Sequence, residues 1–471
     1  MIVPLLLLAL VQRPAPSPGD TTAGRPCVVD IDSVGGRAQQ VEVRKGETNV
    51  FAGGGVLAHC RGTGSTLSAD SVAWFAGIGR FDMIGQRHLV HIRDTTLTLD
   101  AVNASYFLHQ ERLEAHKNVV AVNRITGSVL RGPNLTYYRA LKGVRDTLEM
   151  YASGRPTIDY RSNADSGEPY IIVGDRVRFK GNDRMWGGGK VTIDRSDFAA
   201  RGDSMQLDQG AGFAVLVGRP RVEGKGARAY ALTGTRIELG LRDREIRLVK
   251  ALGQGVATGT DWRLTADTIH LALDRRKLQH AFAWSGGGGG GKGDKGDKGD
   301  KADKGGGADR GGRDSTRAKA VSTLNTIEAD SLALDTPDEV LTEARAFRHA
   351  LSTSKKDASA AAAVDWIAGD SLTAHWTQLA DTGGKTKSEL HQIVARGAAR
   401  SLSHIYSSAK DSAAALGPAI DYSRGQMIDI ALKAGKVDRI VVSGRADGVH
   451  LEPAPPKPPP ADSAAKKPSN R

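Results

Sequence analysis

A short motif recurs along the chain and limits the folds that the chain can adopt. An apolar residue is followed by any residue, a small residue, Asp, then Ser or Thr, and a second apolar residue, as in Leu67–Val72 (LSADSV). Apolar and polar residues alternate around the motif, as they do in strands that bury one face. The motif therefore predicts a sheet built from similar units. Further copies lie at Ala200–Leu207, Leu264–Leu271, Ile327–Leu334 and Ile367–Leu372.

Each unit is predicted to be a β-hairpin. After the copy at Leu264–Leu271, a polar turn leads into a second alternating segment, Leu278–Trp284, and Val340–Phe347 follows the copy at Ile327–Leu334 in the same way. The short Asp and Ser/Thr side chains can bond backbone N–H groups and fix a corner. The spacing of the motif aspartates is irregular, which favours variable loops over a solenoid of fixed period. These aspartates are Asp70, Asp203, Asp267, Asp330 and Asp370.

Composition agrees with an all-β fold. Gly accounts for 57 of 471 residues, roughly 12 % where about 7 % is usual, which suits many tight turns. Charged residues at 25 % exclude a disordered chain and a polytopic helical membrane protein. The length favours more than one folded unit.

The chain divides into five predicted segments. Residues 1–24 hold a signal peptide and the mature N-terminal segment, because Ile2–Val11 is an apolar run of h-region length. Residues 25–285 form a first β region and 321–452 a second. Between them, 286–320 is a flexible Gly/Lys/Asp linker, and 453–471 is a disordered, Pro-rich basic tail. We expect no transmembrane helix after the signal peptide.

The positive charge does not point to nucleic acid. The net charge is +12, but residues 286–320 carry nine Lys and Arg against six Asp, and 453–471 carry four against one. Half of the excess thus lies outside the predicted folded regions. Elsewhere, no stretch of sequence interleaves aromatic with basic residues as a nucleic-acid platform would. We therefore predict no nucleic-acid partner.

No motif in the sequence indicates catalysis. A nucleophile elbow is absent, the Gly383–Thr386 segment lacks the first glycine of a phosphate loop, and His88 and His91 have the wrong spacing to ligate one metal from a strand. We expect no catalytic residue, cofactor or metal, and no enzyme. Cys27 and Cys60 are the only cysteines; in an exported chain they can form a disulfide or stay as two thiols.

Four segments resemble the OstA-like family, the periplasmic lipopolysaccharide-transport proteins and the related organic-solvent-tolerance N-terminal domains. The segments share the family's rhythm of a glycine corner with a Val strand, a polar turn, and an apolar-Asp strand that ends in an aromatic residue. The resemblance extends from Val41 to Trp284 and more weakly from Leu324 to Leu451. The four segments are Val50–Ala58, Leu67–Phe75, His116–Val122 and Gly127–Tyr137.

This resemblance implies an open antiparallel β-jellyroll, a V-shaped stack of hairpins whose inner groove holds acyl chains. The implied protein is a non-enzymatic carrier or bridge component for a lipopolysaccharide-type glycolipid, located in the periplasm with or without attachment to the outer membrane. Its implied partners are the glycolipid and other jellyroll transport proteins, joined by edge-strand pairing. Alternation in the best-matched strands gives these groove candidates: Val56, Val72, Trp74, Val90, Ile92, Val120 and Val122.

Two alternatives remain at this stage. The same strands could build a structural or adhesive envelope protein that binds protein or polysaccharide, with the candidate groove residues forming an ordinary packed core. A polysaccharide-active enzyme would need a cleft of paired acidic or basic residues. An open apolar groove would favour the lipid carrier, a packed sandwich the structural or adhesive protein, and a polar cleft the enzyme.

Overall fold

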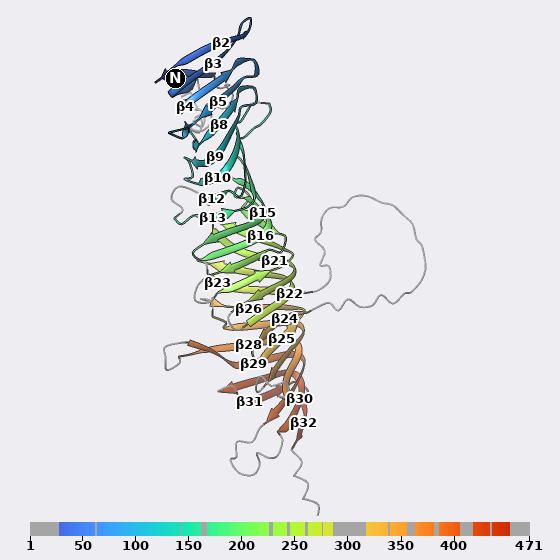
Figure 1. The fold of residues 1–471 in the computed structure, drawn as a ribbon. Coiled ribbons are helices and arrows are strands. Elements are labelled where there is room, and N and C mark those ends of the chain that lie inside the picture. The colour runs from blue at the N-terminus through green and yellow to red at the C-terminus, as the bar shows by residue number, and fades with distance from the viewer. Residues whose placement is uncertain are drawn as a thin grey trace, which may run out of the picture. The chain divides into compact units, whose positions relative to one another are not determined.

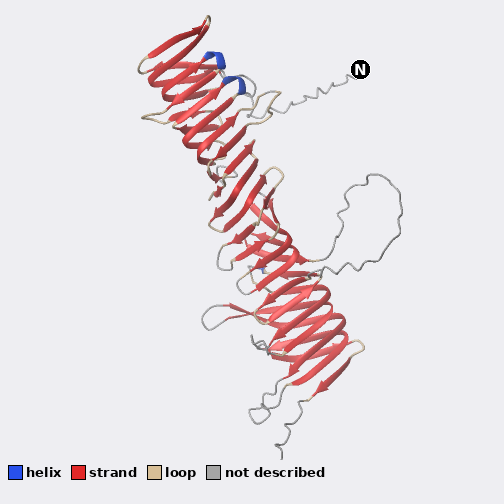
Figure 2. Cartoon of the chain, turned by 45° about the vertical axis from the view of Figure 1, so that its right-hand side comes forward, coloured by secondary structure: helices blue, strands red, loops and turns tan. Residues whose placement is uncertain are grey.

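The protein is an antiparallel all-β protein, as its sequence predicts. The computed structural model describes residues 28–61, 64–141, 143–161, 167–225, 229–242, 245–259, 262–275, 277–285, 317–337, 340–355, 363–380, 386–405, 418–433 and 436–452. Most of these residues lie in strands, and the helices among them are two single 3-10 turns (Figure 2).

Contacts divide the chain into two compact units, Met1–Ile193 and Asp194–Arg471. Within each unit the strands stack in chain order (Figure 1). The elements of the first unit are β1 (Val28–Val34), β2 (Ala38–Arg44), β3 (Glu47–Arg61), β4 (Ser65–Phe75), η1 (Ala76–Ile78), β5 (Arg80–Ile84), β6 (Val90–Arg93), β7 (Leu97–Ala101), β8 (Asn103–Phe107), η2 (Leu108–Gln110), β9 (Arg112–Asn123), β10 (Val129–Tyr138), β11 (Glu149–Ser153), β12 (Thr157–Tyr160), β13 (Tyr170–Val173), β14 (Arg176–Lys180) and β15 (Arg184–Arg195).

Groups of four shorter strands separate the long strands of the second unit, and its last four long strands follow one another directly. Its strands are β16 (Phe198–Asp208), β17 (Phe213–Val217), β18 (Arg221–Gly224), β19 (Tyr230–Thr233), β20 (Arg236–Arg242), β21 (Glu245–Thr258), β22 (Trp262–Asp274), β23 (Lys277–Trp284), β24 (Ala318–Ser322), β25 (Asn325–Ala329), β26 (Ser331–Asp335), β27 (Glu343–Lys355), β28 (Val364–Ala380), β29 (Thr386–Ile405), β30 (Ala419–Lys433), β31 (Lys436–Ser443) and β32 (Asp447–Leu451).

Each long strand belongs to two ladders. In the first unit, the N-terminal half of β4 pairs with β6 and its C-terminal half pairs with β5. One ladder, named here the β6 ladder, runs through β1, β3, β4, β6, β7, β9, β10, β12 and β13. The other, the β5 ladder, runs through β2, β3, β4, β5, β8, β9, β10, β11, β14 and β15. The long strands therefore join the two ladders along one seam.

The second unit repeats this arrangement. The β18 ladder contains β18, β19, β24, β25 and β32 between halves of long strands, and the β17 ladder contains β17, β20, β23, β26 and β31. The hairpins expected from the repeated motif are present as β22–β23 and β26–β27. Alternation of polar and apolar residues thus led to the correct local pairing.

At the seam, long strands turn a corner through two successive residues with positive φ. Such a pair breaks the ladder register, for example where the β29–β30 register shifts between Arg396 and Ala399. Asp70 lies at a corner too, in the middle of β4 and not at the start of a strand. The corner pairs in these long strands are Gly54–Gly55, Lys117–Asn118, Gly189–Lys190, Gly253–Gln254, Arg348–His349 and Gly397–Ala398.

The boundary between folded parts differs from the expected one. The sequence predicts a linker at 286–320 between two β regions, whereas the chain divides into compact units between Ile193 and Asp194. Strands on both sides of the Gly-rich segment pair directly, β22 with β24 and β23 with β26. Residues 318–320 begin β24. The glycine-rich composition identifies a segment that cannot form a core, but not whether the strands flanking it pair with each other.

Candidate functional site

The inner faces of the two ladders are the candidate site. In the β5 ladder, directly opposed residues form a continuous apolar row across the strands, and each is at most 6 % exposed. We call this row the apolar strip. It consists of Ala52, Val72, Met83, Ala104, Ala115, Leu135, Ala152 and Val177.

The β17 ladder of the second unit carries an equivalent row, in which larger residues and alanines are interspersed. Each residue of this row is at most 3 % exposed. Interspersed large and small side chains allow the facing side chains to interdigitate. The row consists of Leu216, Ile237, Ala251, Ile269, Ala283, Leu332, Ala346, Leu372, Ala395 and Ile428.

Five of the seven predicted groove residues point inward. Val56, Val72 and Val90 are buried, with Val90 at 0 % exposure. Ile92 lies directly opposite the buried Leu67 and Leu99. Trp74 is opposite Phe81, with ring centroids 6.3 Å apart. Since directly opposed residues share a face, Ile92 and Trp74 belong to the inner side as well.

The prediction was wrong in placing Val120 and Val122 on the inner side. Their neighbours Val119 and Ala121 are 1 % and 2 % exposed and face inward. Val120 instead lies between Asp100 and Arg131 on the outer face. All four residues of this segment are apolar, so alternation cannot tell which pair is buried. The corner at Lys117 and Asn118 decides it, because a shift of one residue exchanges the two faces of a strand.

Opposite the seam, the strands of each ladder end in turns, and we call these two rows of turns the lips. In the first unit, side chains connect the lips at two places. The hydroxyl groups of Tyr137 in the β5 ladder and Thr96 in the β6–β7 turn share a hydrogen bond, and burial raises the pKa of Tyr137 to about 12. Asn123 Nδ2 donates to Asn182 Oδ1 at 3.3 Å. The inner space of this unit is therefore closed at these positions by polar contacts.

A buried carboxylate lies near the same lip. Glu111 is 4 % exposed, and the Tyr106 hydroxyl donates to its Oε2 at 2.6 Å. Arg139 Nη1 is 3.9 Å from the same oxygen. Burial first, and then the hydrogen bond to Glu111, raise the pKa of Tyr106 above its ordinary value. A buried carboxylate requires such partners. The cluster lies beside the apolar interior.

The seam has its own polar anchor at Asp70. Its Oδ2 accepts backbone N–H groups from Gln86 at 2.6 Å, from Arg87, and from His88 at 2.9 Å. These bonds, above all the one from the His88 backbone, hold the pKa of the Asp70 carboxyl well below its usual range. Asp70 thereby fixes the connection from β5 to β6, as expected of the motif Asp, and its role is structural.

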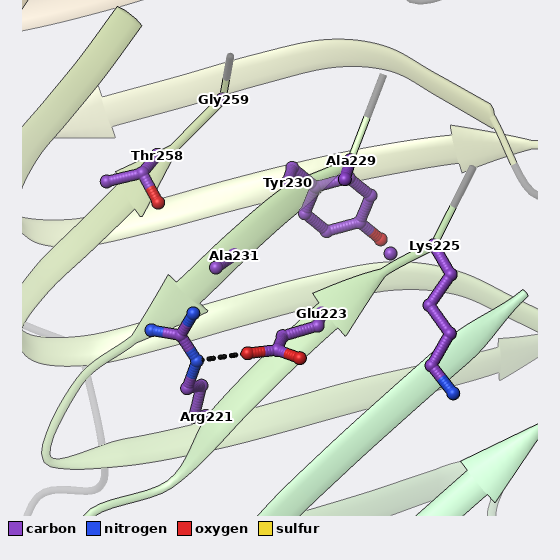
Figure 3. A pocket seen from close by; sticks show the side chains of 9 residues that line it. Arg221, Glu223, Lys225, Ala229, Tyr230, Ala231, Thr258 and Gly259 are labelled. Carbon is purple, nitrogen blue, oxygen red and sulfur yellow. Dashed lines mark hydrogen bonds and ion pairs between the residues drawn. The ribbon is translucent and has the colours of Figure 1, made fainter. Parts of the chain in front are cut away.

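A shallow hollow of about 450 Å³ opens in the second unit beside β18 and β19 (Figure 3). Arg221 and Glu223 form an ion pair within it, and Lys225 Nζ donates to the Arg195 carbonyl oxygen at 2.9 Å. The described lining holds no Ser, His or Cys, so it offers no nucleophile–base pair of the usual kind. Its charged groups are already partnered, and we assign it no reaction.

Four further sequence expectations concern the cysteines, metal ligands, membrane-spanning helices and the two ends of the chain. Cys60 is disulfide-bonded; Cys27 lies outside the described residues, so the Cys27–Cys60 pairing stays a prediction. Within the described ranges, no three His, Cys, Asp or Glu side chains gather as metal ligands would. No helix in the described part of the chain has the length and apolar character needed to cross a bilayer. The predicted signal peptide and the C-terminal tail fall outside the described residues.

Sequence reasoning missed the contacts between the lips and the Tyr106–Glu111 pair. Thr96 and Tyr137 are 41 positions apart in the printed sequence and belong to different ladders, so no local pattern joins them.

No protein-family model matches the chain, and no curated protein matches it either.

Proposed function

We propose that this protein is a non-enzymatic carrier or bridge component for a lipopolysaccharide-type glycolipid, acting in the periplasm in outer-membrane biogenesis. In this proposal each pair of ladders is an open β-jellyroll. Acyl chains lie between the two inner faces, and the sugars and phosphates stay outside. Transport of this kind needs no catalytic group.

The apolar strip is the observation that carries the proposal. It continues without a charged residue across eight strands of the β5 ladder, a span of roughly 34 Å at the usual distance between strands. Each acyl methylene buried against such a surface contributes about 0.8 kcal/mol. The backbone ladders are joined at the seam, whereas side-chain contacts alone connect the lips among the described residues of the first unit.

Loading requires the lips to separate, because the inner residues pack closely in this structure. In the first unit, separation breaks the Tyr137–Thr96 and Asn123–Asn182 hydrogen bonds. A typical hydrogen bond contributes a net 0.5–1.5 kcal/mol, so two cost roughly 1–3 kcal/mol. Burial of four methylenes, about 3 kcal/mol, is enough to offset this cost. Acyl burial on this scale therefore compensates for the two hydrogen bonds at the lips.

Edge strands support the proposed head-to-tail partners. Among the described residues, β1 and β2 pair only with β3, and β31 and β32 pair only with β30. Their outer edges keep unpaired backbone groups, to which another strand can be added. A second jellyroll protein with a similar edge is the partner we propose for each end.

The experiment places a photo-crosslinking amino acid at Val72, on the apolar strip, or at Val120, on the outer face. The full chain is expressed in the periplasm of a lipopolysaccharide-producing host, irradiated, purified without detergent and analysed by mass spectrometry. We expect a covalently attached glycolipid at Val72 and little or none at Val120. Equal labelling at both positions, or no lipid at Val72, would overturn the proposal. Both variants replace a Val with the same probe, and because Val72 is buried, circular dichroism must first show that each variant folds.

A further inference from the structure

The outer face of the β5 ladder carries aromatic and arginine side chains in alternation. The strands involved lie in sequence order across this face, from β8 to β15. We call this surface the arginine–aromatic face. It consists of Phe107, Arg112, Tyr138, Tyr151, Arg178 and Trp186.

Strand register places these side chains in two neighbouring rows. In one row, Phe107 is directly opposite Arg112, which is directly opposite Tyr138. In the next, Tyr151 is directly opposite Arg178, which is directly opposite Trp186. The two rows meet where the Tyr138 and Tyr151 rings pack edge to face at 5.9 Å.

The guanidinium groups stack on the rings. Arg112 lies 4.1 Å from the Phe107 centroid, and Arg178 lies 5.2 Å from Tyr151 and 5.3 Å from Trp186. Arg145 adds a third guanidinium, 4.9 Å above Tyr138. Stacking restricts the arginine side chains, so less conformational entropy is lost when an anion binds to them.

Positive charge predominates on the same outer face. From β5 to β15 its acidic residues are Asp82, Glu114 and Glu149, which form ion pairs with Arg80, Arg112 and Arg178 respectively. Glu149 contacts Arg178 at 3.1 Å, and the Arg178 side chain still keeps 43 % of its surface exposed. The basic residues outnumber these three acids; they are Arg80, Arg112, Arg176, Arg178, Lys180 and Arg184.

We propose that the arginine–aromatic face binds an acidic oligosaccharide. The apolar faces of sugar rings pack against the Tyr and Trp rings, and the acidic groups on the sugars accept paired N–H bonds from the stacked guanidinium groups. The face lies on the opposite side of the β5 ladder from the apolar strip. Glycan binding there is therefore independent of lipid between the ladders.

The interleaved acids favour a glycan over a nucleic acid. Glu114 and Glu149 lie within the rows and would repel a chain that carries a phosphate at every nucleotide. Sugar hydroxyl groups can instead donate hydrogen bonds to these carboxylates. A surface with acceptors, guanidinium donors and rings fits the mixed chemistry of an acidic sugar chain.

The test measures binding of the full chain to a galacturonic acid hexamer by calorimetry, beside neutral maltohexaose and an oligo(dT) strand. We expect the acidic hexamer to bind more tightly than the other two. Arg178→Gln should weaken binding about tenfold, as loss of a charge-assisted hydrogen bond does. Arg178→Lys keeps the charge but not the planar group, and it should weaken binding less than Arg178→Gln does. Adding salt should weaken binding of the acidic hexamer.

The matched control is Arg93→Gln, which removes one exposed arginine from the outer face of the β6 ladder and should leave affinity unchanged. If Arg178→Gln does not fold by circular dichroism, Tyr151→Leu replaces it, with the same expected loss. Three results would overturn the proposal. Maltohexaose could bind as tightly as the acidic hexamer, or Arg93→Gln could weaken binding as much as Arg178→Gln. The third is that oligo(dT) binds more tightly than the acidic hexamer and that Arg178→Gln weakens this binding. None of them bears on lipid cross-linking at Val72, so this inference and the proposed function fail separately.

Discussion

Asp70 and His88 are joined twice across the seam of the first unit. Asp70 Oδ2 accepts the His88 backbone N–H at 2.9 Å, and Asp70 Oδ1 lies 2.9 Å from Nδ1 of the His88 ring. One carboxylate thus fixes both the backbone and the side chain of the residue that leads into β6, and the corner depends on its charge.

We expect Asp70→Asn to destabilise the first unit and to reduce its sensitivity to acid. The pKa of Asp70 is lowered in the folded protein, so its contribution is present above the ordinary Asp pKa of about 4 and is lost as pH falls below that value. Urea unfolding between pH 3 and pH 7 measures this. Asp100→Asn is the control, because Asp100 contacts His91 on the outer face. An acid dependence unchanged by Asp70→Asn would contradict the assignment.

Tyr106→Phe should lower the free energy of unfolding by about 1–3 kcal/mol, because the buried Glu111 carboxylate loses the hydroxyl that donates to it. Tyr138→Phe removes a hydroxyl from a half-exposed residue on the outer face and should cost less than about 0.5 kcal/mol. Denaturant titration of both variants compares the two positions. Equal losses would mean that Glu111 does not depend on Tyr106.

The corner at Gly397 and Ala398 offers a test of backbone conformation. Gly397 has a φ of 77°, and an added Cβ would clash with Asp370 Oδ2, so Gly397→Ala should cost at least about 1–2 kcal/mol. Ala398 has a φ of 46° and already carries a Cβ. Ala398→Gly relieves the strain of a positive φ but increases the conformational freedom of the unfolded chain. The free energy of unfolding should therefore hardly change. Thermal unfolding distinguishes the two, and similar melting temperatures would refute the corner geometry.

Under the proposed function, weakening the lips should speed lipid entry. Tyr137→Phe keeps the buried ring but removes the hydrogen bond to Thr96, so we expect faster uptake of fluorescent lipopolysaccharide in stopped-flow mixing. Tyr138→Phe changes the neighbouring outer residue and should leave uptake unchanged. If both variants take up lipid at the wild-type rate, the Tyr137–Thr96 contact does not limit loading.

Head-to-tail assembly through the free edge of β2 predicts an effect of charge at that edge. Val43 is 54 % exposed on β2, and Val43→Lys should weaken association, since lysine protects edge strands from pairing. Val120→Lys adds the same charge to a strand that is paired on both sides and should not. Sedimentation velocity over a range of concentrations measures the assembly. If the Val43→Lys variant associates as strongly as the wild type, this edge is not the contact.

Local patterns in the sequence predict the strand content, the hairpins and the role of the motif Asp in a corner. Alternation and turn residues act over a few neighbouring positions, which is why β22–β23 and the motif Asp70 could be identified without coordinates. Alternation also placed Val56, Val72 and Val90 on the inner side, and a polar neighbour marks the opposite face beside Val72 and Val90. It failed at Val119–Val122, where every residue is apolar and only the preceding corner decides which pair is buried.

Tertiary structure decided everything that depends on register between distant segments. No stretch of the sequence interleaves aromatic and basic residues, yet pairing of β11, β14 and β15 brings Tyr151, Arg178 and Trp186 into one row. Pairing of β22 with β24 likewise joins strands on both sides of the glycine-rich segment. Cross-strand neighbours are set by the cooperative burial of whole faces, and that burial has no local signature in the chain.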